Sequence, residues 1–549
     1  MRPLSTYKEL INWKPDNANN KCIFDYQKPI FQEMNGCKVG ENLNSQRNKV
    51  LLCHDMKGGY LDDALTEKNE EIYAYRFYHW HLVDIFIYFS HNFITIPPTG
   101  WIYHSHRLNG VQCLGTLIIE HDPSHENLKC FQDSDNVLLT AEKLTDIKNF
   151  YNFDGWLINI EVNIKDLNVV NNIKFFLSSL VELGNEVHWY DSITNSGHLR
   201  WQNGLNQLNK SFYDCCGNIF LNYCWNKKTL ENSISHANGV INNIFVGIDC
   251  FGRGCYGGGG LNCCSALQLI EDIVKENHSK CTSKFSIALF APGWCYESCK
   301  DKQEYDKNTL LFYQFIEKYL HPCLDGRSVY RQLPEINQDK NCLFLTNFDM
   351  GQGFHQFLKG ELISKEPCNF LFNQSILPTG AVSEINTNVK IVLLPDRHVS
   401  YTGHSCTSIT AEKSCRTEEL VNESVNVELF RIGCEITKYF HISLLIVLGW
   451  RNTCIDIANC ISVVLSFNEG DNDIRTKEFT LGAINAGNYR SDFNGVEWNV
   501  FRLDNLHQVL KCATVNLTIR KISLKMFSSE IFKFLLSDKI FLGHLEIGH

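Results

Sequence analysis

An amide and a carboxyl side chain stand two residues apart in an apolar segment, at Asn159 and Glu161. The segment 153–161 reads FDGWLINIE and is typical of a buried β-strand. Alternate side chains of a strand share one face, so Asn159 and Glu161 point the same way as Leu157. Burying such a polar pair costs free energy unless it is hydrogen bonded or does chemistry. The pair is therefore a candidate for acid catalysis, with a structural hydrogen bond to a neighbouring strand as the alternative.

Strand-like segments recur through residues 48–325 and alternate with segments of helical periodicity, most clearly over 169–180 and 266–274. This alternation predicts an α/β fold, a (β/α)₈ TIM barrel, with an open doubly wound sheet as the alternative. The predicted strands are Val50–His54, Val83–Phe89, Val111–Ile119, Gly155–Glu161, Glu186–Tyr190, Asn218–Cys224, Ile244–Asp249 and Ser286–Ala291.

Barrel enzymes keep their active sites at the C-terminal ends of the strands. Asn159 and Glu161 lie at the end of the fourth predicted strand, Tyr190 at the end of the fifth and Asp249 at the end of the seventh. This position favours a catalytic role for Asn159 and Glu161 over a structural one.

The spacing around Glu161 resembles the Asp-x-x-Asp-x-Asp-x-Glu strand of barrel chitinases, with Leu157 in place of the middle Asp and Asn159 in place of the last. In that chemistry the substrate's 2-acetamido oxygen attacks the anomeric carbon, a side chain orients the amide, and the Glu protonates the leaving oxygen. These families are exceptions to the two-carboxylate rule of glycoside hydrolysis. An Asn suits an oxazoline-like intermediate because it forms hydrogen bonds without adding negative charge.

The chain as a whole resembles the cytosolic endo-β-N-acetylglucosaminidases of glycoside hydrolase family 85. The resemblance follows the predicted barrel in order and extends past it. The motifs that carry it are His54–Tyr60, Phe77–Trp80, Asp84–His91, Thr95–Pro98, Trp189–Ser192, Trp201–Asn203, Phe251–Gly254, Ala291–Trp294 and Thr346–Gly353.

This resemblance implies an endoglycosidase that cleaves the GlcNAc-β1,4-GlcNAc chitobiose core of N-linked glycans. It implies substrate-assisted, retaining catalysis through an oxazoline, with transglycosylation as a side activity. By the same resemblance Glu161 is the acid and base, Asn159 orients the acetamido group, and Tyr190 assists at the reaction centre.

The resemblance also implies substrate-binding residues. Trp201, Trp225 and Trp294 are expected to bind the substrate, the first two as aromatic walls of the sugar subsites. Asp249 ends a strand and is expected either to line the site or to brace Arg253. The chain departs from the family after the third strand, where Glu120-His121 replaces the expected Glu-Trp, which puts a sugar-stacking contact there in doubt.

Two other functions stay open on the sequence. The first is a conventional two-carboxylate retaining glycosidase, with Asp249 or Glu120 as the nucleophile. The second is a non-catalytic glycan-binding protein on an inactive barrel.

Composition limits the partners. The 549 residues carry a formal charge of −10 without a basic stripe, which argues against nucleic acids and anionic membranes. N-glycans, glycopeptides and free oligosaccharides suit this charge, and we expect a monomer. The cysteines lack paired C-x-x-C spacing, so we expect no metal, and nothing indicates a cofactor.

The sequence divides into three parts: an N-terminal arm packed on the barrel (1–47), the catalytic barrel (48–325), and an antiparallel β-sandwich region of one or two domains (326–549), for which a likeness to carbohydrate-binding modules is one alternative. No signal peptide is visible, and the longest apolar stretch, 439–450, is too short to span a bilayer. We therefore expect a cytosolic protein. Five Asn-x-Ser/Thr sequons keep a secreted protein as the alternative.

Overall fold

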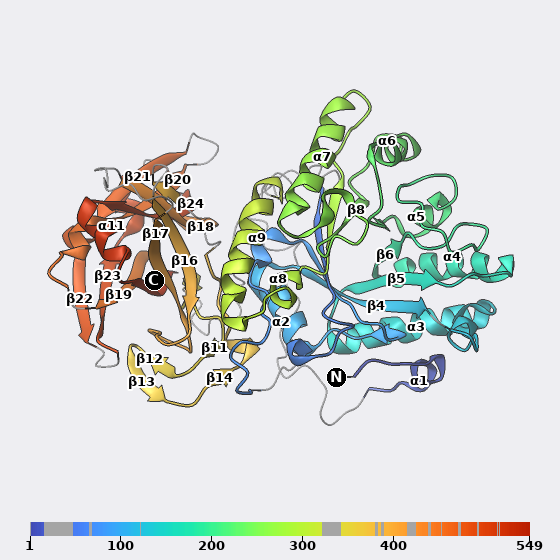
Figure 1. Ribbon diagram of the computed structural model, residues 1–549, viewed down its shortest axis with the longest axis horizontal. Helices are drawn as coiled ribbons and strands as arrows, with labels where there is room; N and C mark the ends of the chain where they lie inside the picture. The colour runs from blue at the N-terminus through green and yellow to red at the C-terminus, as the bar shows by residue number, and fades with distance from the viewer. Residues whose placement is uncertain are drawn as a thin grey trace.

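Eight parallel strands close into a barrel in the first part of the chain (Figure 1). The ring is closed by pairing between β2 and β4, which excludes the open sheet and confirms the predicted TIM barrel. Its strands are β1 (Val50–His54), β2 (Ile85–Tyr88), β4 (Gln112–Glu120), β5 (Gly155–Glu161), β6 (Glu186–Tyr190), β7 (Ile219–Leu221), β8 (Ile244–Asp249) and β9 (Ser286–Phe290). The computed structural model describes residues 2–15, 48–64, 68–120, 122–320, 342–378, 383–385, 389–413, 424–437, 441–451, 453–469, 474–490, 494–512, 514 and 516–548.

Helices connect most of the barrel strands and cover the barrel's outer face (Figure 1). Between β1 and β2 the described residues form two 3₁₀ turns instead, Asp62–Ala64 and Trp80–Leu82. None of the described helices is both long enough and apolar enough to cross a membrane. The barrel helices are α2 (Thr99–Asn109), α3 (Ser134–Tyr151), α4 (Leu167–Glu182), α5 (Lys210–Cys216), α6 (Lys227–His236), α7 (Cys263–Glu276), α8 (Trp294–Glu297) and α9 (Tyr305–Leu320).

The two faces of β5 pack as the alternation predicts. Leu157 belongs to the apolar cluster that fills the barrel interior, with Ile87 and Phe245 among its members. Trp156 and Ile158 belong to the larger core outside the barrel, between strands and helices. Because both faces of a parallel barrel strand are buried, the side that carries Leu157, Asn159 and Glu161 must look into the barrel.

The described N-terminal residues lie on the barrel. The backbone of Leu4 pairs with that of Ile94 in the short strand β3 (Ile94–Thr95), which runs antiparallel to β4. Helix α1 (Tyr7–Asn12) follows, and the hydroxyl of Tyr7 donates to Asn136 Oδ1 at 2.9 Å. The rest of the predicted arm, residues 16–47, lies outside the described residues, as does the predicted boundary at 325/326.

Two antiparallel sheets form the β-sandwich of the C-terminal region, as predicted. The rings of Phe344 and Phe430, one from each sheet, pack with their centroids 5.2 Å apart. Short helices α10 (Leu506–Val509) and α11 (Ser529–Leu535) join strands of the sandwich. One sheet has the order β15 (Ser383–Ile385), β16 (Val389–Asp396), β17 (Cys406–Lys413), β25 (Ile540–Gly548), β19 (Ser443–Arg451), β23 (Val496–Leu503), β22 (Asn485–Arg490), with β10 (Cys342–Thr346) also on β25; the other has the order β18 (Ser424–Thr437), β24 (Asn516–Phe527), β20 (Ile461–Asn468), β21 (Arg475–Thr480).

Buried polar contacts join the barrel to this region. Two small ribbons belong to this region: β11 (Gln352–Gly353) with β14 (Cys368–Asn369), which lies beside the barrel, and β12 (Gln356–Leu358) with β13 (Glu361–Ser364), which lies below the C-terminal sheets (Figure 1). Arg397, which follows β16, forms a buried ion pair with Asp306 of α9, and its Nε donates to the carbonyl of Ile72 at 3.1 Å. The side-chain amides of Gln352 and Gln374 donate to the backbone carbonyls of Ala74 and Phe77 at 2.8 and 2.9 Å.

These contacts predict that the barrel cannot be separated cleanly from the C-terminal region. A truncation that ends near Gly326 removes Arg397 and leaves the Asp306 carboxylate without its buried partner. Breaking a buried ion pair by removing one partner costs about 3–5 kcal/mol, and each unpaired carbonyl adds to the loss. We expect the truncated protein to be insoluble or unstable in expression and thermal melting. A soluble, fully active truncated barrel would contradict this.

Candidate active site

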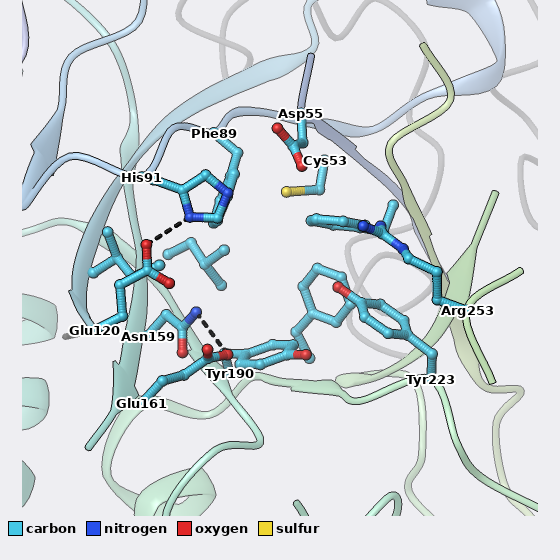
Figure 2. Close-up of a pocket in the computed structure, with 14 residues that line it drawn as sticks. Cys53, Asp55, Phe89, His91, Glu120, Asn159, Glu161, Tyr190, Tyr223 and Arg253 are labelled. Atoms are coloured by element: carbon cyan, nitrogen blue, oxygen red, sulfur yellow. Dashed lines mark hydrogen bonds and ion pairs between the residues drawn. The ribbon is translucent and has the colours of Figure 1, made fainter. Parts of the chain in front are cut away.

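A cavity of about 180 Å³ opens at the C-terminal ends of the barrel strands (Figure 2). It brings together Asn159, Glu161 and Tyr190, the three residues that the sequence singled out for catalysis. The full lining is Cys53, Asp55, Phe89, His91, Ile118, Glu120, Leu157, Asn159, Glu161, Tyr190, Phe220, Tyr223, Arg253 and Phe290.

Asn159 lines this cavity, and its amide oxygen is buried without a hydrogen-bond partner among the described residues. Its Nδ2 donates to Glu161 Oε1 at 3.3 Å, which turns its Oδ1 away from the carboxyl group. A buried acceptor without a partner costs about 1–3 kcal/mol, so an N–H group of a ligand would be bound favourably here.

Glu161 is electrostatically suited to hold a proton. Burial raises the pKa of its carboxyl, and the neighbouring Glu120 carboxylate raises it further. The hydrogen bond from Asn159, the charge of His91 and a hydrogen bond from the Trp201 indole act in the opposite direction, and the pKa remains raised. A raised pKa increases the protonated fraction near neutral pH, as a general acid requires.

A second carboxyl, Glu120, lies beside Glu161 but is already paired. The two residues are register partners at the ends of β4 and β5. Glu120 Oε1 lies 2.6 Å from His91 Nδ1, a contact that raises the pKa of the imidazole (Figure 2). His91 therefore offsets the negative charge of Glu120 next to the buried acid. His121, where the family resemblance breaks, lies outside the described residues.

Tyr190 ends β6 and is buried at the wall of the cavity. Its hydroxyl donates to Asn222 Oδ1 at 2.9 Å. Burial raises the pKa of the phenol well above its usual range, so it stays protonated. The aromatic neighbour Tyr223 lines the same cavity.

The three tryptophans predicted for the subsites lie in different surroundings. Trp201 is 40% exposed in the loop between β6 and α5, beside Glu161. Trp225 is buried; its Nε1 donates to the Gly247 carbonyl at 2.7 Å. Trp294 packs against Phe312 of α9, with ring centroids 5.9 Å apart. None of the three belongs to the described lining of the cavity, and only Trp201 lies at its acid.

Asp249 forms an ion pair with Arg253. It is fully buried, and its two oxygens accept from Arg253 Nε at 2.8 Å and Nη2 at 3.0 Å. The backbone N–H groups of Phe251 and Arg253 donate to it as well. Arg253 lines the cavity, whereas Asp249 does not belong to its described lining.

Several lining residues were not predicted as site residues from the sequence. Tyr223 and its neighbour Asn222 fall within the predicted strand 218–224, at the strand end where an active site would be expected. His91 closes the motif Asp84–His91, and Arg253 follows Asp249 by four residues. Their position after strands was the available signal. Their orientation depends on loop conformations that the sequence pattern does not specify.

The described residues contain no group of three or more His, Cys, Asp or Glu side chains arranged to hold a metal ion. Each cysteine whose side chain the structure describes is a free thiol.

Comparison with known sequences gives a consistent relationship. The chain is similar to the cytosolic endo-beta-N-acetylglucosaminidase of Homo sapiens, with 37% identity over 386 residues, 68% of this chain and 47% of the human protein. It is similar to cytosolic endo-beta-N-acetylglucosaminidase 2 of Arabidopsis thaliana, with 36% identity over 350 residues, 62% of this chain and 46% of the plant protein. The chain thus spans about half the length of the curated relatives it matches.

A solved structure shares the fold. The glycoside hydrolase domain of Endo-D from Streptococcus pneumoniae R6 aligns with 100% of this chain and 82% of that chain, at a TM-score of 0.63 and 18% identity. In addition, the sequence profile of glycosyl hydrolase family 85 matches residues 60–356, more than half of the 549 residues. The matched range holds Asn159, Glu161 and Tyr190. The chain belongs to glycosyl hydrolase family 85.

Proposed function

We propose that the protein is an endo-β-N-acetylglucosaminidase that cleaves the chitobiose core of N-linked glycans by substrate-assisted, retaining catalysis. The observation that carries the proposal is the unpartnered Oδ1 of Asn159, buried beside the Glu161 carboxyl, whose pKa is raised, in the lining of one cavity. This pair offers one acceptor for an amide N–H and one acid for a leaving oxygen. The human and Arabidopsis relatives carry the name of this activity.

In the first step Glu161 gives its proton to the glycosidic oxygen as the bond to the anomeric carbon breaks. The carbonyl oxygen of the substrate's own acetamido group attacks that carbon and closes an oxazolinium ring. The amide nitrogen becomes positively charged, so its N–H bonds more strongly to Asn159 Oδ1 in the transition state than in the ground state. Interactions that strengthen in this way accelerate the chemical step.

In the second step the ionised Glu161 acts as a base. It takes a proton from water, which attacks the anomeric carbon and reopens the oxazoline with net retention of configuration. A sugar hydroxyl in place of water gives transglycosylation. One carboxyl serves both steps because the leaving and attacking oxygens occupy the same side of the sugar.

The surroundings of Asp249 and Glu120, the two candidate nucleophiles, support a conventional two-carboxylate mechanism less well than the surroundings of Asn159 support substrate assistance. Retaining enzymes of that type need a second, available carboxylate about 5–5.5 Å from the acid. Asp249 is fully buried and chelates Arg253, and Glu120 is paired with His91. A non-catalytic glycan-binding protein would have no use for a buried carboxyl with a raised pKa.

The substrates are N-glycans, glycopeptides and free oligosaccharides, and no nucleic acid, membrane or second subunit is needed. The human and Arabidopsis relatives are named as cytosolic, and we propose that this protein also acts in the cytosol.

The test is incubation of the full chain with a defined high-mannose glycopeptide, followed by mass spectrometry of both products. We expect a peptide that keeps one GlcNAc and a glycan that has lost one. An unchanged glycopeptide that nevertheless binds would identify a lectin. Release of the whole glycan would place the cut outside the chitobiose core. Either outcome would overturn the proposal.

The charge pair beside Glu161 predicts a pH effect. His91→Gln removes the positive charge that offsets Glu120, so the Glu120 carboxylate is left beside Glu161 without compensation. A negative neighbour favours the protonated form of a carboxyl, so the pKa of Glu161 rises. We expect the alkaline limb of the kcat/KM profile to move to higher pH. The double variant His91→Gln/Glu120→Gln serves as the control and should reverse the shift. An unchanged limb, or one moved to lower pH, would contradict this account of the site.

A further inference from the structure

The Tyr190 hydroxyl is one end of a hydrogen-bond chain that leads away from the cavity. It donates to Asn222 Oδ1 at 2.9 Å. Asn222 Nδ2 donates to Asn203 Oδ1 at 2.7 Å, and the same Asn203 oxygen accepts the backbone N–H of Cys224 at 3.1 Å. This chain of hydrogen bonds links the end of β6, the residues after β7 and the loop that precedes α5.

The donor and the acceptor of each hydrogen bond can be assigned by starting from the Cys224 backbone N–H, at the end away from Tyr190. A backbone N–H can only donate, so the atom of Asn203 that meets Cys224 is its oxygen. That oxygen is also what Asn222 meets, so Asn222 must turn its NH₂ group toward Asn203 and its own oxygen toward Tyr190. An amide oxygen cannot donate. The proton of the Tyr190 hydroxyl is therefore committed to Asn222.

The committed proton determines what Tyr190 offers the substrate. With its only proton on Asn222, the phenol oxygen presents lone pairs, not a donor, to the cavity. Tyr223 lines the same cavity, with its ring centroid 6.3 Å from that of Tyr190. An oxygen lone pair directed at the reacting sugar stabilises the positive charge that develops there, and does so more in the transition state than in the ground state.

A buried carboxylate holds the far end of the chain in place. Asp191, directly after Tyr190, is fully buried. It accepts the backbone N–H groups of Gln202 and Asn203 at 3.1 and 2.7 Å and Asn209 Nδ2 at 2.9 Å. Asn203 has a left-handed backbone, with φ of 54°, a conformation that Asn tolerates well. The same loop carries Trp201, so one clamp fixes both Asn203 and the tryptophan beside Glu161.

We propose that Asn222 and Asn203 are positioning residues that fix the Tyr190 hydroxyl as a hydrogen-bond acceptor toward the substrate, and that Asp191 anchors the loop on which this depends. The inference rests on the proposed function, since it assigns how Tyr190 takes part in that reaction. It gives a physical reason for the matching motifs Trp189–Ser192 and Trp201–Asn203, which the acid and the acetamido-binding residue leave unexplained.

The test is a double-mutant cycle between Asn222 and Tyr190, run on the full chain with a glycopeptide substrate. Asn222→Ala leaves the Tyr190 hydroxyl free to rotate. We expect kcat to fall about tenfold, which corresponds to the free energy of one hydrogen bond, and KM to stay within about twofold. In the Tyr190→Phe background the same substitution should change kcat by less than about twofold, because the group it positions is gone. Additive losses in the double variant would show a purely structural Asn222 and overturn the inference.

Asn203→Asp is the matched control. A carboxylate still accepts from both Asn222 and Cys224, and Asp tolerates the left-handed backbone, so we expect kcat within about threefold of the parent protein. A fall in kcat of about tenfold or more in a folded variant would contradict the assigned direction of these hydrogen bonds. This control also keeps the inference testable if Asn222→Ala does not fold. The parent protein and Glu161→Gln are assayed alongside: failure of the proposed function appears as no chitobiose cleavage by the parent protein, whereas failure of this inference appears only in the cycle or the control.

Discussion

Glu161→Gln is expected to abolish hydrolysis of natural N-glycans, with a fall in rate of about 10²–10⁴-fold. The leaving group is a sugar hydroxyl, which departs as an alkoxide unless it is protonated. Gln has nearly the shape of Glu and can keep a hydrogen bond with Asn159, but it cannot donate a proton and then remove one. The rate is measured on a defined glycopeptide, with thermal melting to show that folding is unchanged.

A substrate with a better leaving group provides the control for Glu161→Gln. A glycan attached to a nitrophenol needs no protonation, because nitrophenolate is stable near neutral pH. Formation of the intermediate from this substrate should be largely spared in Glu161→Gln, while the natural bond is not cut. Near-normal turnover of the natural glycopeptide by a folded variant would remove Glu161 from the mechanism.

Asn159→Ala is expected to separate two reactions that a conventional glycosidase cannot separate. Asn159 Oδ1 serves to orient the acetamido group while the oxazoline forms. Once a glycan oxazoline is supplied ready-made, that task is already complete. The variant should lose hydrolysis of glycopeptides but still transfer a preformed glycan oxazoline to a GlcNAc acceptor, because Glu161 remains to act as the base.

The comparison requires both assays on the same purified protein, after its melting temperature is confirmed. If Asn159 were purely structural, its loss would leave Glu161 with one hydrogen bond fewer, cost about 1–3 kcal/mol of stability and harm both reactions together. Glu161→Gln is the matched comparison, because it removes the base and should lose the transfer as well. Parallel loss of both activities in well-folded Asn159→Ala would count against substrate assistance.

The barrel and the catalytic pair could be predicted because both depend on local patterns. Parallel strands buried on both faces have short apolar sequences, and alternation within such a strand determines which side chains look inward. Asn159, Glu161 and Tyr190 end two neighbouring strands, so they meet at one end of the barrel regardless of how the loops run.

The surroundings of that pair could not be predicted, because they depend on loops and on contacts distant in sequence. A tryptophan in a matching motif can stack on a sugar or fill the core; Trp225 donates to the Gly247 carbonyl and is buried, whereas Trp201 is exposed. The pairing of β10 with β25 joins strands roughly two hundred residues apart, which no local pattern specifies. The contact of His91 with Glu120 is likewise not specified by any local pattern.

The central claim is that the substrate's acetamido oxygen, and not a carboxylate of the protein, attacks the anomeric carbon. The most direct measurement is the cleavage rate of a series of glycans whose reacting acetamido group carries no, one, two or three fluorine atoms. Fluorine withdraws electrons from the amide and makes its oxygen a poorer nucleophile, while an attacking carboxylate is unaffected. The account predicts that kcat falls steeply with each added fluorine. A rate that stays level across the series would contradict it and show that a carboxylate of the protein is the nucleophile.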